Sequence, residues 1–397
     1  MVGTIQTSAS PWHLNNQRSL VGAIAQMRTA LETDLAETTE SWHSSYLTEA
    51  SPVTLNALSQ IFHLSRFEQC LLLLCAGMEL DGQWGTLCAA AQGDPQRPFP
   101  TLSLALSFLP EPCWQALAPQ AALRHWRLIE IGHGNALTTS PLRIDEQILH
   151  YLTGTPSQDS RLAGFVEPMS LEMDLVPSHQ QIVSQITAYW MQAAAVQPTP
   201  GLLPVIQLWG EDSLSKQAIA SQTCQELDLQ IIKLSAEVLP TDISQIILIK
   251  EICEREYLLN NTAILLDCDY LENTDGTREH AIARFIESIQ VPLIVMGRDR
   301  RPQRQRALLP IQINAPTLEE QRVLWRKALN SPHELTNGEY PETIQGDDKD
   351  HSSARSTNQF IDDPIDTLVS YFNLSSSSIH AISLQDRTPL TSDTALS

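Results

Sequence analysis

The sequence predicts an α/β protein, with a mostly helical N-terminal domain followed by an α/β/α sandwich that ends in a small helical lid. Three observations support this prediction. Apolar residues recur at helical spacing in the first third of the chain. Short apolar strands alternate with helices from 202 to 330, which is typical of a parallel sheet covered on both faces. The 397 residues are also enough for two or three domains with cores of their own.

Residues 1–50 predict a flexible N-terminus with one helix. The first 16 residues are polar, and we expect them to be disordered. From Arg18 onward, apolar residues follow a helical period: Leu20, Val21, Ile24, Met27 and Leu31. A polar stretch then continues to about Pro52.

The pattern of residues 51–165 predicts one compact domain, with several helices followed by a β-hairpin. Helices are expected over Leu55–Phe62, after Ser65, at Trp84–Ala91, at Leu102–Leu109 and at Asp145–Leu152, with strands at Arg127–Ile131 and Leu137–Ile144. The helix after Ser65 has capping-box spacing to Glu68, and its run Cys70–Cys75 must be buried on nearly all sides. This order of helices and then a hairpin is that of a winged-helix domain.

Winged-helix domains often bind DNA, so that alternative is weighed here. The candidate recognition helix, Phe67–Met78, is apolar, and its one neighbouring basic residue is Arg66. The only basic residue in the hairpin tip is His133. The net charge of −21, from 46 acidic and 25 basic residues, also repels a phosphate backbone. The composition therefore favours protein docking through residues 51–165 and makes nucleic-acid binding the weaker alternative.

The remaining segments follow in order. We expect residues 166–200 to form a helical connector, with a helix at Ser178–Ala195. Residues 201–330 are expected to form an α/β core. The core strands are expected at Val205–Trp209, Gln230–Leu234, Ala263–Asp267, Pro292–Met296 and Ile311–Ile313; its helices are expected at Lys216–Leu227, Thr241–Asn260, Arg278–Ile289 and Leu318–Leu329. An acidic disordered insertion (331–358), a helical lid remnant (359–386) and a polar tail (387–397) complete the chain.

A phosphate-binding loop is nearly complete between the first core strand and its helix. The Walker A pattern is a strand, then GxxxxGK[ST], then a helix. Gly210 and Lys216 keep its spacing, but Ser215 stands where the second glycine belongs and Gln217 where the Mg²⁺-binding hydroxyl belongs. The candidate nucleotide-binding residues are Gly210, Glu211, Asp212, Ser213, Leu214, Ser215, Lys216 and Gln217. The alternative for Lys216 is an exposed lysine at the start of a helix.

A second acidic motif strengthens this interpretation. The apolar strand Ala263–Asp267 ends in Asp267-Cys268-Asp269, which is the Walker B arrangement of a buried strand that delivers an acid beside the phosphate loop. Asp267 is the candidate Mg²⁺ ligand. Five arginines follow the next strand, at 298, 300, 301, 304 and 306; we favour a solvated loop over an arginine finger.

Together with Pro316–Arg322, these motifs resemble an AAA+ ATPase module. The resemblance implies that ATP and Mg²⁺ would bind, that a glutamate would follow the Walker B aspartate, and that the sensor strand would end in a polar residue. Here Cys268 and Gly297 stand in those two places. Each loss typically costs 10²–10³-fold in rate, so the combined losses predict little ATP hydrolysis.

The runs Leu71–Asp81, Leu87–Pro98, Trp126–Glu130 and Ser140–Asp145 are similar to the N-terminal domain of a bacterial AAA+ family, including members associated with extracellular contractile injection systems. That family would place two ATPase modules after the domain, the first commonly degraded. The resemblance covers about residues 50–385, and no second GxxxxGK[ST] follows. The chain would then be a fragment, a split gene product or an accessory subunit.

These patterns lead to a functional hypothesis with two alternatives. The leading hypothesis is an assembly or regulatory scaffold that associates with itself or with a partner AAA+ ATPase. The alternatives are a weakly active, nucleotide-binding ATPase and a winged-helix DNA-binding regulator.

The cysteines and the N-terminus bear on location. Seven scattered cysteines without a CxxC pair predict free thiols in a reducing cytoplasm and no zinc site. No signal peptide is recognisable, and we expect no membrane association.

Overall fold

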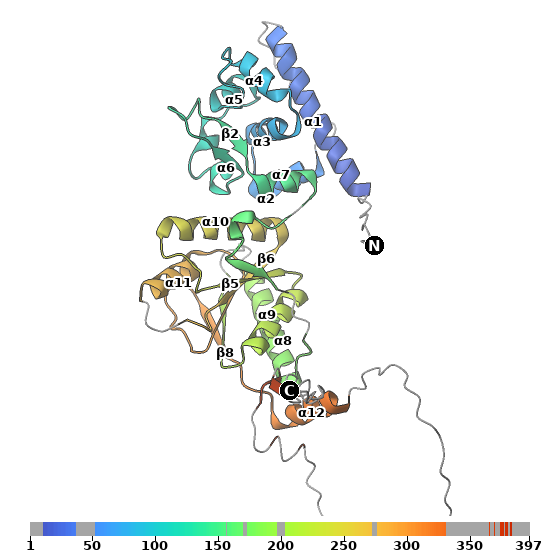
Figure 1. Ribbon diagram of the computed structural model, residues 1–397, viewed down its shortest axis with the longest axis vertical. Helices are drawn as coiled ribbons and strands as arrows, with labels where there is room; N and C mark the ends of the chain where they lie inside the picture. Colours follow the sequence, from blue (N-terminus) through green and yellow to red (C-terminus); the bar gives the residue numbers. More distant parts are fainter. Residues whose placement is uncertain are drawn as a thin grey trace, which may run out of the picture. The chain divides into compact units, whose positions relative to one another are not determined.

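A computed structural model of the protein describes residues 11–36, 52–155, 157–169, 173–196, 203–271 and 276–330, with isolated positions between 365 and 382. They group into two compact units (Figure 1). The helical unit comprises Met1–Glu167, Val238–Thr262 and Asp275–Val291, and the sheet unit comprises Pro168–Glu237, Ala263–Thr274 and Pro292–Ser397. The expected segments 331–358 and 387–397 lie outside the described residues, as do residues 1–10 and most of 359–386.

The helical unit has the predicted order of helices and then a hairpin. Its elements are α1 (Pro11–Ala36), α2 (Val53–Phe62), α3 (Arg66–Leu80), α4 (Trp84–Ala91), α5 (Leu102–Phe108), the 3₁₀ turn η1 (Trp114–Leu117), α6 (Ala122–His125), β1 (Ile129–Ile131), β2 (Leu142–Ile144), α7 (Glu146–Thr153) and η2 (Ser160–Leu162). Strands β1 and β2 pair antiparallel, with Ile129 opposite Ile144. Two further helices, α10 (Ile243–Asn260) and α11 (Gly276–Ser288), group with this unit.

Helix α1 corrects the expectation of a flexible N-terminus. It begins at Pro11 rather than at Arg18, so residues 11–16 are helical rather than disordered. Proline is compatible with the first turn of a helix, where its missing N–H would have no partner. Leu20, Ile24 and Leu31 are buried in the core of the helical unit, and α1 contacts α3, α4 and α7. The apolar face of α1 therefore belongs to the folded domain.

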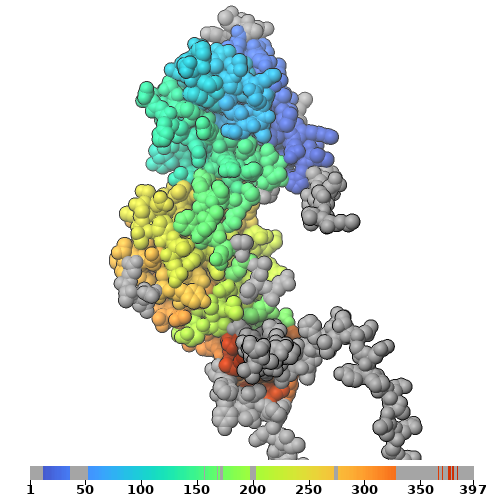
Figure 2. All heavy atoms as spheres, viewed as in Figure 1, coloured from blue at the N-terminus to red at the C-terminus, as the bar shows by residue number. Residues whose placement is uncertain are grey.

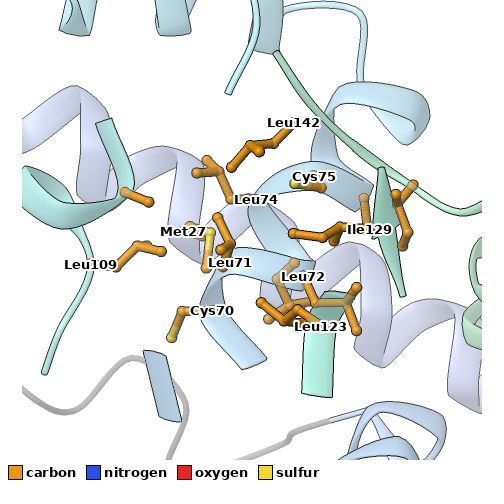
Figure 3. Packing of buried hydrophobic residues seen from close by; sticks show 14 of the residues in the cluster. Met27, Cys70, Leu71, Leu72, Leu74, Cys75, Leu109, Leu123, Ile129 and Leu142 are labelled. Carbon is orange, nitrogen blue, oxygen red and sulfur yellow. The ribbon is translucent and has the colours of Figure 1, made fainter. Parts of the chain in front are cut away.

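Helix α3 is the centre of this core. The predicted capping box is confirmed, because the Ser65 hydroxyl accepts from the Glu68 N–H and the Glu68 carboxylate accepts from the Ser65 N–H. Figure 3 shows side chains of α3 among residues of α1, α6, β1 and β2. Ten consecutive or near-consecutive residues of α3, from Phe67 to Gly77, are buried. Most of the length of α3 is therefore enclosed by the rest of the domain.

The sheet unit is built on a six-stranded sheet of order β3-β5-β6-β7-β4-β8. Besides β3 (Val166–Pro168), which lies at the division between the two units, its elements are α8 (Pro177–Val196), β4 (Val205–Trp209), α9 (Ser213–Glu226), β5 (Gln230–Ser235), β6 (Thr262–Asp267), β7 (Leu293–Gly297), β8 (Leu308–Gln312) and α12 (Leu318–Asn330). Strand β4 pairs parallel with both β7 and β8, and β6 pairs parallel with β7. The fold class is therefore the predicted one: a winged-helix-like helical domain and a mostly parallel α/β domain, consistent with an AAA-like fold.

One boundary differs from the prediction in this unit. Helix α8 is not a separate connector, since Val183, Ile186 and Trp190 are buried in the core of the sheet unit and the helix packs on α9. Among the few described positions of the expected lid, Val369 and Ile379 are helical and buried against Trp325 of α12. This small cluster agrees with a helical segment beyond α12, although the lid as a whole is not described.

A buried ion network fixes α10 within the helical unit. The Arg255 guanidinium is fully buried and lies 3.1 Å from the Asp145 carboxylate and 2.5 Å from that of Asp159. It also donates to the Arg127 carbonyl at 2.8 Å. Arg161 bridges both carboxylates from the other side, at 2.6 and 2.8 Å. Two cations therefore neutralise two buried anions, which makes the burial of these charges tolerable.

Removal of Arg255 tests this network. In an Arg255→Ala variant, Asp145 and Asp159 stay buried with one cation fewer, so we expect the free energy of unfolding to fall by about 3–5 kcal/mol. The matched control is Arg127→Ala, which removes a part-exposed pair with Glu251 and should cost less than about 1 kcal/mol. Urea denaturation measures both. Equal losses in the two variants would contradict the assignment.

The pH dependence of stability tests the same network through Asp159. Burial raises the pKa of Asp159, but hydrogen bonds and charge from Arg161 outweigh burial and hold the pKa below its usual value. A depressed acid stabilises the fold above its unfolded pKa of about 3.9, and this contribution is lost as pH falls through the folded pKa. The stability difference between wild type and Asp159→Asn should be complete at neutral pH and shrink below about pH 4. A constant difference from neutral to acidic pH would refute this.

Candidate functional site

The candidate site lies where the ends of β4, β6 and β7 meet. Parallel strands place their carboxyl ends at one edge of a sheet, where α/β proteins hold ligands. Gly210 follows β4 with φ +142°, and a Cβ at this position would lie 2.4 Å from the Ile313 carbonyl oxygen. Its N–H donates to the Gly297 carbonyl at 3.1 Å. Glycine is therefore required here by both its backbone conformation and its close packing.

Helix α9 begins three residues earlier than predicted. It starts at Ser213 rather than at Lys216, so only residues 210–212 separate it from β4. The cause is Asp212, which is the N-cap: its carboxylate accepts from the Ser215 N–H at 3.3 Å and from the Ser215 hydroxyl at 2.6 Å. Ser215, at the position of the motif's second glycine, thus lies inside the helix with its side chain bound to the cap.

Lys216 is held entirely by the protein. Its side chain is fully buried, which rules out the alternative of an exposed lysine at a helix start. The Nζ atom donates to the carbonyls of Gly210 and Gly297, at 2.6 and 3.0 Å, and to the Asp269 carboxylate at 2.5 Å. An ammonium group has three donors, and here each has an acceptor.

The two aspartates at the end of β6 have different contacts. Asp267 accepts from the Asp269 N–H at 3.0 Å, and burial raises the pKa of Asp267 above its ordinary value. Asp269 turns its side chain to Lys216 instead. Cys268 is buried, and its N–H donates to the Met296 carbonyl. Among the described residues, no group of three or more His, Cys, Asp and Glu side chains is placed to hold a metal ion.

The donor set does not fit a bound triphosphate in this conformation. A phosphate loop offers backbone N–H groups from residues outside the helix and a lysine with donors to spare. Here the loop is reduced to three residues, the Asp212 carboxylate occupies the helix N-terminus, and Lys216 has its three acceptors already. The Asp269 carboxylate beside Lys216 would moreover repel a phosphate.

The other predicted site residues lie around this centre. Glu211 and Leu214 are exposed, while Gln217 is half-buried and donates from Nε2 to the Ser213 hydroxyl at 3.2 Å. In the arginine loop, Arg298, Arg300 and Arg304 are exposed. Arg306 donates to the Leu203 carbonyl at 3.0 Å.

Two contacts at the centre were missed from the sequence. The Asp212–Ser215 cap has a local signal, because aspartate is a favoured N-cap and its partner lies three residues on. The Lys216–Asp269 pair has no such signal, since it joins residues 53 positions apart. Only the sheet order, which brings the β6 end close to α9, could have suggested it.

Comparisons with known proteins bear on the helical unit. The family model described as "Winged helix domain, variant" matches residues 8–166, and this range includes α1. No curated protein matches the chain. Among the matching solved structures is the FIGL-1 AAA domain in complex with ADP, with 12% identity and a TM-score of 0.35, covering 56% of this chain and 75% of that chain. That TM-score is too low to assign a fold or a ligand, so the AAA-like description rests on the sheet itself.

Two further observations concern the setting of the protein. All seven cysteines are free thiols, and six of them are buried. In the part of the chain that the structure describes, no helix is long and apolar enough to cross a bilayer.

A double-variant cycle tests the buried Lys216 pair. Lys216→Met leaves Asp269 as an unpaired buried anion, so the free energy of unfolding should fall by about 3–5 kcal/mol. Adding Asp269→Asn removes that anion and should recover at least about half of the loss. Lys327→Met, which removes the exposed pair with Asp174, is the control and should cost less than about 1 kcal/mol. Strictly additive effects of the two substitutions would show that the pair does not exist.

Proposed function

We propose that this chain is a nucleotide-independent assembly or regulatory scaffold, built from a winged-helix docking domain and an AAA-like module whose phosphate site has degenerated. One observation carries the proposal: all three donors of the Lys216 ammonium bind acceptors of the same chain. The carboxylates of Asp212 and Asp269 supply the negative charge that phosphate would otherwise bring. Cys268 and Gly297, which stand where a catalytic carboxylate and a polar sensor would be needed, add support.

The proposed partners are a second copy of the chain or an AAA+ ATPase with an intact site. Residues 51–165 are the proposed docking domain: they lie within the range that the winged-helix family model matches, and the candidate recognition helix, α3, is mostly buried. The ancestry we propose is the bacterial AAA+ family that includes members associated with contractile injection systems. The proposed location is the cytoplasm, which is consistent with seven free thiols.

Thermal stability with and without nucleotide tests the proposal against the weakly active ATPase. A ligand at 100 times its Kd stabilises the folded state by about 2.7 kcal/mol, which would raise Tm by several degrees. We expect no change in Tm with millimolar ATP or ADP and Mg²⁺. Mg²⁺ alone and an equal concentration of inorganic triphosphate serve as ionic-strength controls.

Turnover completes the test. Purified protein should release no phosphate above the background set by a Lys216→Met/Asp269→Asn preparation that circular dichroism shows to be folded. A nucleotide-dependent rise in Tm, or phosphate release that this double variant loses, would overturn the proposal in favour of an ATPase.

A further inference from the structure

The three acceptors of the Lys216 ammonium are not held equally. The Gly297 carbonyl ends β7, which pairs with β4 and β6, and it also accepts from the Gly210 N–H at 3.1 Å. The Gly210 carbonyl belongs to the turn in which a Cβ would meet the Ile313 carbonyl. Asp269 supplies the one acceptor that lies on a side chain. A side chain can turn away by rotation about its own bonds, whereas the two carbonyls cannot move without disturbing the sheet edge.

The Asp269 carboxylate is only half satisfied. Its Oδ1 atom accepts from Lys216 at 2.5 Å, but its Oδ2 atom is buried and has no hydrogen-bond donor among the described residues. The side chain as a whole is 3% exposed. A buried carboxylate oxygen without a donor costs free energy, and buried polar atoms are normally paired. The unpartnered oxygen therefore marks Asp269 as the weakly held member of the Lys216 site.

The chain reaches solvent directly after this residue. In Figure 2 the segments of the sheet unit, coloured from green to orange, pack closely, and Lys216 is fully buried among them. Strand β6 ends at Asp267, whose carboxylate accepts from the Asp269 N–H at 3.0 Å. Tyr270, the next residue, is 62% exposed. A carboxylate placed beyond the end of the strand and one residue before an exposed tyrosine can reach water while β6 stays paired.

We propose that Asp269 is an autoinhibitory group: its carboxylate competes with an external oxyanion for the Lys216 ammonium, and its withdrawal opens the site to inorganic phosphate or to the phosphoryl group of a nucleotide. Carboxylates and phosphates both bind an ammonium group through anionic oxygens. Either one supplies the negative charge that a buried cation requires. Since only the open state binds the anion, the apparent Kd is the intrinsic Kd divided by the open fraction. The Asp269 charge keeps that fraction small in the wild type.

Asp212 contributes a second negative charge to the same place. Its carboxylate caps α9 by accepting from the N–H and the hydroxyl of Ser215. The N-terminus of this 14-residue helix favours an anion, and Asp212 already provides one. Its capping role does not need the charge, because asparagine caps a helix about as well as aspartate. Asp212 therefore weakens anion binding through its charge alone, while Asp269 is the group that has to leave.

This inference rests on the proposed function, in which the wild-type site is closed, and it names the group that closes it. The two can fail separately. Nucleotide binding by the wild type would overturn the nucleotide-independent scaffold, but the competition would stand if Asp269→Asn bound at least roughly tenfold more tightly. An Asp269→Asn variant that gains no anion binding would overturn the competition and leave the scaffold standing.

Removal of the Asp269 charge on the full chain is the test. Asp269→Asn keeps the shape of the side chain and an acceptor oxygen for Lys216, but not the negative charge. We expect inorganic triphosphate to raise the Tm of this variant by several degrees and to leave that of the wild type unchanged, with chloride at equal ionic strength as the reference. Asp212→Asn/Asp269→Asn should respond more strongly. ATP should act as triphosphate does, and adenosine, which has no phosphoryl group, should have no effect.

Two further variants control for charge and for binding elsewhere. Asp299→Asn makes the same charge change at an exposed position beyond β7 and should behave as the wild type. Lys216→Met/Asp269→Asn should lose the response. If Asp269→Asn does not fold in chloride, its refolding yield replaces Tm, and triphosphate should restore folding. The proposal would be overturned by an Asp269→Asn protein that triphosphate neither stabilises nor refolds, by a response that persists without Lys216, or by an equal response in Asp299→Asn.

Discussion

The buried ammonium group of Lys216 is the constraint on which the sheet edge depends. Its three acceptors come from the turn after β4, the end of β7 and the segment after β6, so one side chain ties three strand ends together. The charge cannot stay in the interior without Asp269, and the two carbonyls orient the group so that no donor is left over. Gly210 and the early start of α9 fit this arrangement, because both bring the lysine toward the strands instead of toward solvent.

A second buried cation has the same role in the helical unit. Arg255 of α10 meets Asp145, which also caps α7, and Asp159 at the start of η2. Apolar replacements of buried ion pairs are often as stable, so such pairs are better understood as fixing one arrangement than as adding stability. The chain has 46 acidic residues and 25 Lys and Arg residues. Carboxylates that could pair with a buried cation are therefore more abundant than the cations. Both buried cations bind two or more elements that are distant in sequence.

The sequence predicted those features whose cause is local. The strand Val205–Trp209 and the capping box at Ser65 follow from short-range periodicity and capping, and the structure has both. The start of α9 was misjudged because the motif was aligned on Lys216, while the helix is set by the Asp212 cap. Helices α1 and α8 were assigned to flexible or connecting segments, since their apolar faces could be recognised but not the surfaces that they cover. The Lys216–Asp269 pair depends on sheet order and lies beyond any local pattern.

The proposed closure of the phosphate site would change how such a module is regulated. A ligand can shift a conformational equilibrium only by its differential affinity for the two states. If Lys216 keeps its acceptors within the chain, nucleotide has no preferred state to select, and the strand ends lose the switch that an intact site would provide. Control must then come from binding events elsewhere, which act through concentration. On this reasoning, association with a partner, set by the concentration of each protein, would be the remaining control over a module whose state nucleotide does not set.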